Sequence, residues 1–319
     1  MQVREMTRSD RGAVLDLLQH AFGLRELFER YMDFDPAFAY GDYLLATEGD
    51  TPVACVQIFD KTIWLRGETV RLGGIGSVAT HASHRGRGVS SELLERALER
   101  MRARGMWLSL LFAAPVAPLY ERLGWHRVPA PLLRLSPKSR SSEPVEPVGR
   151  AFRPEDLWQV AALYEAYTEP LSGPTLRDAS YWRGQLHTAG TPEEDFRVAE
   201  RDGAIEAYAR VASFNGRLRV LEYARAARGA DALAELLVAH AHGPHALHAP
   251  FVRDPELGAA LERRGIEISL ARDPSPMWRV LEHARVARLA GLSDSSPDAE
   301  LLAELVGEGA ATYWPSDRF

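Results

Sequence analysis

The chain has 319 residues, of which 46% are hydrophobic and 26% are charged, a composition typical of a globular protein long enough for two domains. Its net charge of −6 argues against a nucleic-acid-binding protein, which needs a concentrated basic surface. The single cysteine, Cys55, excludes an internal disulfide framework. The sequence contains no apolar run of about eighteen residues and no N-terminal signal pattern, so we expect no membrane partner and a cytoplasmic location.

The first eighty residues predict a strand, a helix and then three further strands. Residues 2–23 combine a short strand with an apolar stripe at helical spacing, and residues 42–80 read as three strands separated by turns. Between them, residues 24–41 are rich in aromatic and acidic side chains. This mixture would suit a substrate that carries an ammonium group, and ordinary packing explains it equally well.

A basic loop at residues 83–91 connects the last of these strands to a strongly patterned helix at residues 92–101. The first turn of a helix presents unpaired N–H groups and the positive end of the helix dipole. Glycines in the loop, Gly86 and Gly88, allow the backbone to approach a ligand closely. The loop therefore predicts a binding site for an anion such as a pyrophosphate, with a simple basic turn as the alternative.

One motif in this loop resembles a known family. Arg85-x-x-Gly88-x-Ser90 is similar to the Arg/Gln-x-x-Gly-x-Gly/Ala motif of the GNAT superfamily of N-acetyltransferases, with serine in place of the small final residue. In that family the loop binds the pyrophosphate of acetyl-CoA. The resemblance implies that acetyl-CoA is the co-substrate and that no metal takes part.

A second motif follows at the spacing expected for the same family. After a strand predicted at residues 106–112, the sequence Leu119-Tyr120-x-x-x-Gly124-Trp125 resembles the family's Leu-Tyr-x-x-x-Gly-Phe/Tyr motif, with tryptophan as the final aromatic residue. Two motifs at this spacing favour acetyl-CoA binding over a simple basic turn.

The resemblance also implies how the co-substrate would be held. In the family, the strand that leads into the loop splays from its neighbour, and its backbone groups hold the pantetheine arm and polarise the thioester carbonyl. The residues assigned in this way are Val78, Ala79 and Thr80 on the strand, Arg85, Gly86, Arg87, Gly88, Val89, Ser90 and Ser91 in the phosphate-binding loop, and Ala114 and Pro115 along the pantetheine arm.

The second half of the chain repeats the order of elements without the anion-binding loop. Residues 136–150 are rich in proline, serine and charged residues and predict a linker. Residues 151–275 follow the element order of a second GNAT fold, but residues 224–230 lack the glycine motif. We therefore expect a mixed α/β protein with two tandem GNAT folds, each a twisted, mainly antiparallel sheet flanked by helices. The catalytic fold would occupy residues 1–135.

Four histidines lie close together in the second half of the chain, at the end of a predicted helix and in the loop after it. They are His240, His242, His245 and His248. Their spacing fits no standard zinc pattern and no cysteine lies nearby, so we do not expect a metal site.

The C-terminal segment narrows the resemblance. Two GNAT folds followed by a segment ending in Phe319 resemble the enhanced-intracellular-survival (Eis) acetyltransferases, although residues 276–319 are too few for the additional domain of about a hundred residues in that group. The resemblance implies that the segment returns to the active site with its terminal carboxylate as general base, and it allows a homo-oligomer. A carboxylate with an ordinary pKa of about 3.5 is a weak base for an ammonium group. An ordered terminus without a catalytic role is the alternative.

The expected activity is acetyl transfer from acetyl-CoA to a primary amine by direct attack, which needs no covalent enzyme intermediate. By resemblance, Tyr120 lies beside the CoA sulfur and acts as general acid, with a purely packing role as the alternative. The acceptor would be a small molecule resembling an aminoglycoside or a polyamine, or a peptide. A second hypothesis is a non-catalytic acyl-CoA-binding or structural module, which would keep the loop but need no acid at residue 120.

Overall fold

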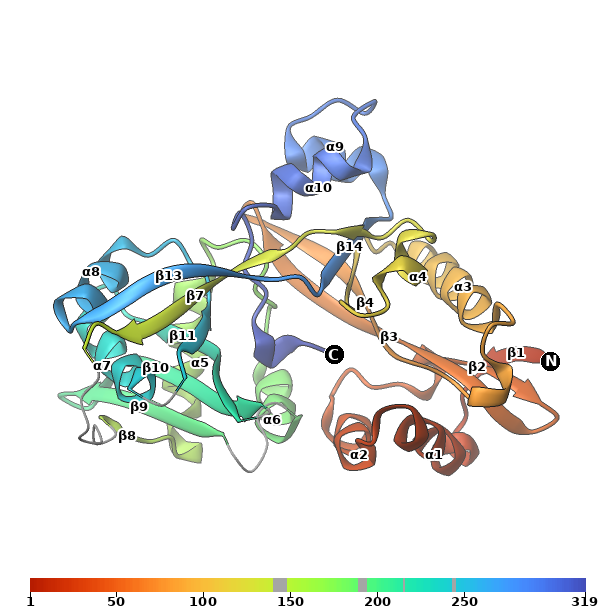
Figure 1. Cartoon of the computed structure of the whole chain (residues 1–319), viewed down its shortest axis with the longest axis horizontal. Coiled ribbons are helices and arrows are strands. Elements are labelled where there is room, and N and C mark those ends of the chain that lie inside the picture. Colours follow the sequence, from red (N-terminus) through yellow and green to blue (C-terminus); the bar gives the residue numbers. More distant parts are fainter. Residues whose placement is uncertain (140–147, 189–193, 215, 243–244) are drawn as a thin grey trace.

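The computed structural model describes residues 1–139, 148–188, 194–214, 216–242 and 245–319. In these residues the chain forms two seven-stranded sheets, each mixed, mainly antiparallel and flanked by helices (Figure 1). The predicted fold class, with two tandem α/β folds, is confirmed. Most of the predicted linker, residues 140–147, lies outside the described part of the chain.

The first sheet is centred on a long hairpin of β3 (Thr51–Leu65) and β4 (Glu68–Thr80). The other strands are β1 (Gln2–Glu5), β2 (Tyr43–Glu48), β5 (Leu108–Phe112), β6 (His126–Arg127) and β14 (Pro276–Val280), and the helices are α1 (Arg11–Phe22), α2 (Arg25–Phe34), α3 (Val89–Ala103) and α4 (Ala117–Glu121). Successive residues of β3 face opposite sides of the sheet. Cys55 is buried with α1, and Val56 is buried with α3. The sheet is therefore covered on both faces, with α1 and α2 on one side and α3 on the other (Figure 1).

The second sheet is centred on β10 (Ala204–Phe214) and β11 (Arg217–Arg225). The other strands are β7 (Ala130–Pro137), β8 (Arg150–Ala151), β9 (Asp195–Arg201), β12 (Leu247–Pro250) and β13 (Ile266–Asp273), and the helices are α5 (Leu157–Thr168), α6 (Ala179–Thr188), α7 (Ala230–Ala241) and α8 (Pro255–Arg263). Leu233, Leu236 and Leu237 of α7 are fully buried on this sheet, because their spacing places them on one face of the helix.

The two sheets exchange strands. The order of the first sheet is β1-β2-β3-β4-β5-β14-β6, and that of the second is β13-β7-β12-β11-β10-β9-β8. The chain leaves the first sheet after β6 to form β7 in the second, and it returns after β13 to form β14 between β5 and β6. The predicted boundary at residue 135 thus falls within β7, and the predicted C-terminal segment begins with a strand of the first sheet. The division of the chain into domains stays a prediction.

The two folds also meet along the edge of β3. Backbone hydrogen bonds join Trp64 to Pro174 at 3.0 Å and Leu176 to Thr62 at 2.8 Å, so residues 173–176 extend the sheet beyond the end of β2. A strand edge with unpaired backbone groups is a natural place for such an addition.

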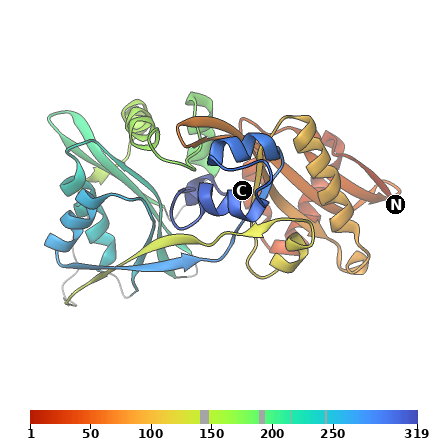
Figure 2. The same ribbon diagram turned by 90° about the horizontal axis from the view of Figure 1, so that it is seen from above.

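The C-terminal segment lies between the two folds. Helices α9 (His283–Ala290) and α10 (Asp298–Val306) pack beside the first sheet, and the C-terminus then lies near the middle of the molecule (Figure 2). Single 3₁₀ turns occur at Arg8–Asp10, Tyr40–Asp42, Ala82–His84, Pro154–Asp156 and Pro315–Asp317. In the part of the chain that is described, none of the helices has the length and apolar character that crossing a membrane requires.

Candidate active site

Strands β4 and β5 run side by side and then separate. Their parallel register covers three residue pairs, the last of which is Gly74–Leu110. Beyond Gly74, β4 continues in register with β3 as far as Thr80, whereas β5 ends at Phe112. The separation that the family resemblance implies therefore begins after Gly74, and Val78, Ala79 and Thr80 lie on the free part of β4.

A β-bulge interrupts β4 within this free part. The register with β3 gains one residue on β4 at positions 77–78, and Ser77 has a positive φ of 52°. The Ser77 hydroxyl donates a hydrogen bond of 2.9 Å to Oε1 of Gln57, and it lies 3.1 Å from the Tyr43 hydroxyl. A bulge takes backbone groups out of the regular ladder. An amide at Val78 that is released in this way could bind a carbonyl oxygen in the gap.

The glycine-containing loop leads directly from β4 into α3. Gly88 is the residue before the helix and has a left-handed φ of 78°, which glycine adopts without strain. The first intrahelical hydrogen bond runs from the Glu92 amide to the Gly88 carbonyl at 3.1 Å, so the amides of residues 89–91 precede it. Arg85 and Arg87 are exposed beside this turn. The loop therefore combines free helix N–H groups with two cationic side chains, as an anion site requires.

Side chains tie the loop to the end of β4. Nε of Arg85 donates to the Thr80 carbonyl at 3.1 Å, and the Thr80 and Ser90 hydroxyls are 2.8 Å apart. The serine that replaces the family's Gly or Ala thus makes a hydrogen bond that those residues could not make. Ala114 and Pro115 lie in the turn that follows β5.

Tyr120 lies in α4, directly after that turn. Its side chain is buried against Trp125 in an edge-on contact with ring centroids 6.0 Å apart. The Trp125 indole N–H is 3.3 Å from the hydroxyl of Ser109 on β5, which fixes the pair beside that strand. Burial raises the pKa of Tyr120 to about 12, so the phenol is protonated at neutral pH and is able to donate a proton or a hydrogen bond.

The C-terminal residue packs onto β4 at the start of the gap. A Cβ atom at Gly74 would lie 2.4 Å from Cζ of Phe319, and one at Gly76 would lie 3.2 Å from the terminal carboxylate carbon. The Phe319 ring stacks on Phe59 with centroids 4.9 Å apart and also contacts Phe112. The chain's terminal carboxylate therefore lies beside β4, next to the bulge.

Sequence reasoning missed the glycines that make this approach possible. Gly74 and Gly76 face Phe319, whereas Gly73 of the same strand faces α3, where a Cβ atom would come within 2.0 Å of the Met101 sulfur. Glycine inside a strand often marks close approach of another group. Three glycines in four residues were therefore the available signal for a packed partner.

A small cavity of about 20 Å³ adjoins Phe319 on the side of α2. Its lining includes Tyr31, Asp35 and Lys61, so part of the aromatic and acidic stretch at residues 24–41 does reach the site. Lys61 Nζ is 3.1 Å from the Tyr181 hydroxyl and 3.9 Å from Asp35. Burial lowers the pKa of Lys61, and the nearby Asp35 carboxylate opposes this shift.

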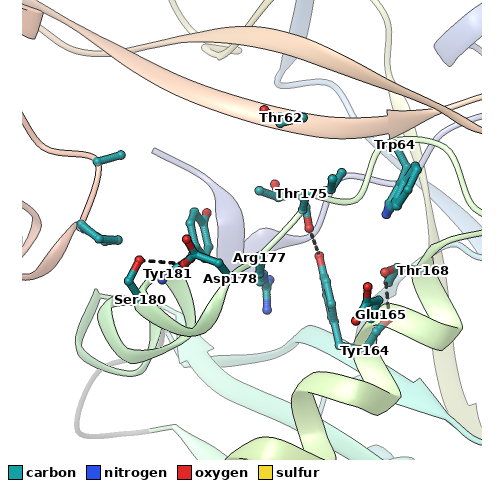
Figure 3. Close-up of a pocket in the computed structure, with 13 residues that line it drawn as sticks. Thr62, Trp64, Tyr164, Glu165, Thr168, Thr175, Arg177, Asp178, Ser180 and Tyr181 are labelled. Carbon is teal, nitrogen blue, oxygen red and sulfur yellow. Dashed lines mark hydrogen bonds between the residues drawn. The ribbon is translucent and has the colours of Figure 1, made fainter.

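A larger cavity of about 520 Å³ opens where the two folds meet (Figure 3). In this view Trp64 on β3 lies above Tyr164 on α5, and Arg177 and Tyr181 lie to their left. Tyr164 donates a 2.7 Å hydrogen bond to the Thr175 carbonyl. The cavity shares Tyr181 with the smaller one beside Phe319.

The histidine group does not converge on a metal site within the described residues, which omit 243–244. Nδ1 of His240 lies 2.9 Å from the Leu236 carbonyl, and Nε2 lies 3.0 Å from the Asp195 carboxylate. His248 lies on β12. Both ring nitrogens of His240 are therefore engaged in protein contacts.

Comparison with known proteins agrees with this geometry. Residues 2–128 match the family model described as an acetyltransferase (GNAT) domain. A GCN5-related N-acetyltransferase from Kribbella flavida has a similar structure at 23% identity, with a TM-score of 0.64 over 91% of this chain and 72% of that one. Eis1 from Mycobacterium abscessus is similar at 16% identity, with a TM-score of 0.62 over 90% and 76%.

The fold also resembles a more distant acyltransferase. Saccharomyces cerevisiae N-myristoyltransferase with bound myristoyl-CoA is similar at 14% identity, with a TM-score of 0.56 over 88% of this chain and 78% of that one. No curated protein matches the sequence. These structural likenesses cover 88% to 91% of this chain, so they extend over both of its folds. With its matching domain model, separated strands and glycine loop, the N-terminal part of this chain is a GNAT acetyltransferase domain.

Proposed function

We propose that the protein transfers an acetyl group from acetyl-CoA to a primary amine. Three features support this proposal: the glycine-containing loop at residues 83–91 that follows β4, Tyr120 in the helix that follows β5, and the Phe319 carboxylate beside Gly76 of β4. Pyrophosphate would bind at the start of α3, and the pantetheine arm would pass between β4 and β5 along Ala114 and Pro115. The thioester would then lie near Val78.

The reaction needs no covalent enzyme intermediate. The amine nitrogen attacks the thioester carbonyl carbon, a C–N bond forms and the C–S bond breaks. Backbone amides at the bulge would stabilise the oxyanion that develops in between. The Phe319 carboxylate would accept the proton that the amine loses, directly or through water, and the Tyr120 hydroxyl would supply a proton or hydrogen bond to the departing thiolate.

The acceptor is proposed to be a small molecule resembling an aminoglycoside or a polyamine, or a peptide. Its amine would approach Phe319 from the side of α2, where Asp35 and Tyr31 line the small cavity. A carboxylate beside aromatic rings favours a cationic group.

The test is release of free CoA thiol from acetyl-CoA, measured with a panel of aminoglycosides, polyamines and peptides. Amine-dependent thiol release, with acetylated product found by mass spectrometry, would support the proposal. Saturable binding of acetyl-CoA without thiol release for any amine would instead indicate a non-catalytic acyl-CoA-binding module.

A further inference from the structure

Four charged side chains are completely buried between the second sheet and the C-terminal segment. They are Arg177, Arg210, Glu222 and Asp317, and each has a side-chain exposure of 0%. Taking charges out of water is expensive unless each one is paired and hydrogen-bonded. We call this cluster the tail anchor. Its burial is favourable only because its members pair with one another.

Arg177 links the tail to the second sheet. Its guanidinium forms a two-bond fork with Glu222 of β11, with N–O distances of 2.7 and 3.2 Å, and its Nε donates to Asp317 at 3.1 Å. The guanidinium also lies 4.2 Å from the ring centre of Tyr164 and 4.5 Å from that of Trp182. A guanidinium fixed by a fork and two ring faces has little freedom to move.

The two arginines of the cluster compensate the negative charge of Glu222. Burial by itself would raise the pKa of Glu222, but Arg177 and Arg210 outweigh it and lower that pKa to about 2. Glu222 also accepts hydrogen bonds from the hydroxyls of Tyr208 and Ser316. The carboxylate is thus ionised at neutral pH and holds both Arg177 and the tail at Ser316.

Asp317 is the point at which the tail is held. Besides Arg177, its Oδ1 accepts a 3.0 Å hydrogen bond from the Tyr181 hydroxyl. The adjacent Ser316 carbonyl accepts a hydrogen bond from Gln185 of α6. Only two residues follow Asp317, which limits the reach of the terminus to about 7 Å. Holding Asp317 in place therefore limits where the terminal carboxylate can lie.

We propose that Arg177 and Asp317 are positioning residues that hold the Phe319 carboxylate beside the bulge in β4. This inference rests on the proposed function of that carboxylate. Packing alone does not require a charged cluster, since apolar residues of similar volume often stabilise a buried site equally well. A directional network of buried hydrogen bonds specifies one position of the tail, and a catalytic group has to be held to within a fraction of an ångström.

A double-mutant cycle on the full-length protein tests the inference. One change is Asp317→Asn, which keeps the shape of the side chain and removes its charge. The other adds one glycine after Phe319, which moves the carboxylate. In the natural-length chain, Asp317→Asn is expected to lower kcat at least tenfold and to change the KM for acetyl-CoA less than twofold. In the extended chain, it is expected to change the residual kcat less than twofold, because the group that it positions has already moved.

The outcomes separate this inference from the proposed function. If Asp317→Asn lowers kcat equally in both backgrounds, the residue has only a structural role and the inference fails. If the added glycine lowers kcat but Asp317→Asn does not, the terminal carboxylate keeps its proposed role and the positioning inference alone fails. If the added glycine leaves kcat unchanged, the proposed role of the carboxylate fails and the inference fails with it.

Two further variants guard against loss of folding. Ser316→Ala removes one hydroxyl that donates to Glu222, and it should show the same non-additive pattern at a smaller amplitude if Asp317→Asn does not fold. Asp254→Asn is the control, because it weakens another two-bond arginine–aspartate pair, the partly buried Arg225–Asp254, away from the tail end. It should lower the melting temperature without changing kcat, and a comparable loss of kcat in this control would overturn the inference.

Discussion

The two folds of this chain each contain a gap between parallel strands, and the two gaps are filled differently. In the first fold, β4 and β5 separate after the pair Gly74–Leu110, and the gap is bordered by glycines. In the second fold, β11 and β12 share the pair Arg219–His248. Beyond that pair, the chain's own side chains reach across the gap.

Two polar contacts close the second gap. The Tyr223 hydroxyl on β11 donates to the Pro250 carbonyl at 3.1 Å, and Arg225 forms a two-bond ion pair of 2.8 Å with Asp254. Trp314 of the C-terminal segment is fully buried against Tyr223, with ring centroids 5.1 Å apart. The same strand topology thus leads to a gap bordered by glycines in one fold and to a gap bridged by side chains in the other.

The loops that precede α3 and α7 also differ between the two folds. The first contains Gly86 and Gly88, both with positive φ, before α3. The corresponding residues before α7 end in Gly229, which has a φ of −88° and lies close to the Glu206 carbonyl. A Cβ atom at Gly229 would come within 2.3 Å of that oxygen, so this glycine allows packing against a neighbouring strand. Element order alone therefore does not make a co-substrate site.

The largest expected effect comes from filling the first gap. Gly74→Ala would place a methyl group 2.4 Å from the Phe319 ring, and neither the ring nor the strand can yield without moving the tail. We expect kcat to fall by more than about 1,000-fold, since the change displaces the terminal carboxylate and narrows the gap. The matched control is Gly258→Ala in α8, where nothing lies within 4 Å of the new Cβ. It should keep full activity and gain up to about 1 kcal/mol in stability. Equal activity of the two variants would show that the first gap is not the site of reaction.

A comparison of two tyrosines should give the next largest effect. Tyr120→Phe is expected to lower kcat by roughly 100-fold, the usual contribution of a general acid, with a change of less than twofold in the dissociation constant of acetyl-CoA. Tyr223→Phe removes the corresponding bridge in the second gap and should lower the free energy of unfolding by about 1 kcal/mol without changing kcat. Steady-state kinetics, calorimetric binding and urea unfolding measure these quantities. Unchanged turnover in Tyr120→Phe would restrict Tyr120 to packing.

Replacing an arginine in each of the two loops should have a smaller effect, on the KM for acetyl-CoA. Arg85→Ala is expected to raise the KM for acetyl-CoA about tenfold, because it would remove the proposed charge-assisted contact with phosphate, and the effect should shrink at high salt. Arg228 is also exposed and precedes the helix of the second fold, so Arg228→Ala is the matched control and should leave this KM unchanged. A similar rise in both variants would mean that general charge, and not the first loop, attracts the co-substrate.

Local patterns in the sequence predicted the loop at residues 83–91 and the helix after it. The separation of the two strands and the role of Tyr120 were expectations from family resemblance. The location of Phe319 was an expectation from family resemblance. Its close packing on Gly74 depends on a contact between residues far apart in the chain, which no periodicity reports.

The tail anchor and the strand exchange were not predicted, for the same reason. Arg177 and Asp317 are separated by 140 residues, and each alone looks like an ordinary charged residue of a surface. Strand β14 was predicted only as part of the C-terminal segment at residues 276–319, because pairing partners across two sheets are not encoded in the local alternation of residues. The three glycines of β4, Gly73, Gly74 and Gly76, were the local signal for close approach, because glycine inside a strand often marks such a contact.

The smallest expected effect concerns the pH dependence of kcat, which should be nearly flat in the alkaline range. Because burial raises the pKa of Tyr120 to about 12, the acidic form of this residue persists through the alkaline range and is lost only as the pH approaches that value. With a saturating acceptor, kcat should therefore fall less than twofold between about pH 8 and pH 10. A decline centred near pH 9 that disappears in Tyr120→Phe would mean that the bound co-substrate lowers the phenol pKa by several units. Measured in Tyr223→Phe, the same profile should not change, since the Tyr223 hydroxyl only bridges β11 to the Pro250 carbonyl in the second fold.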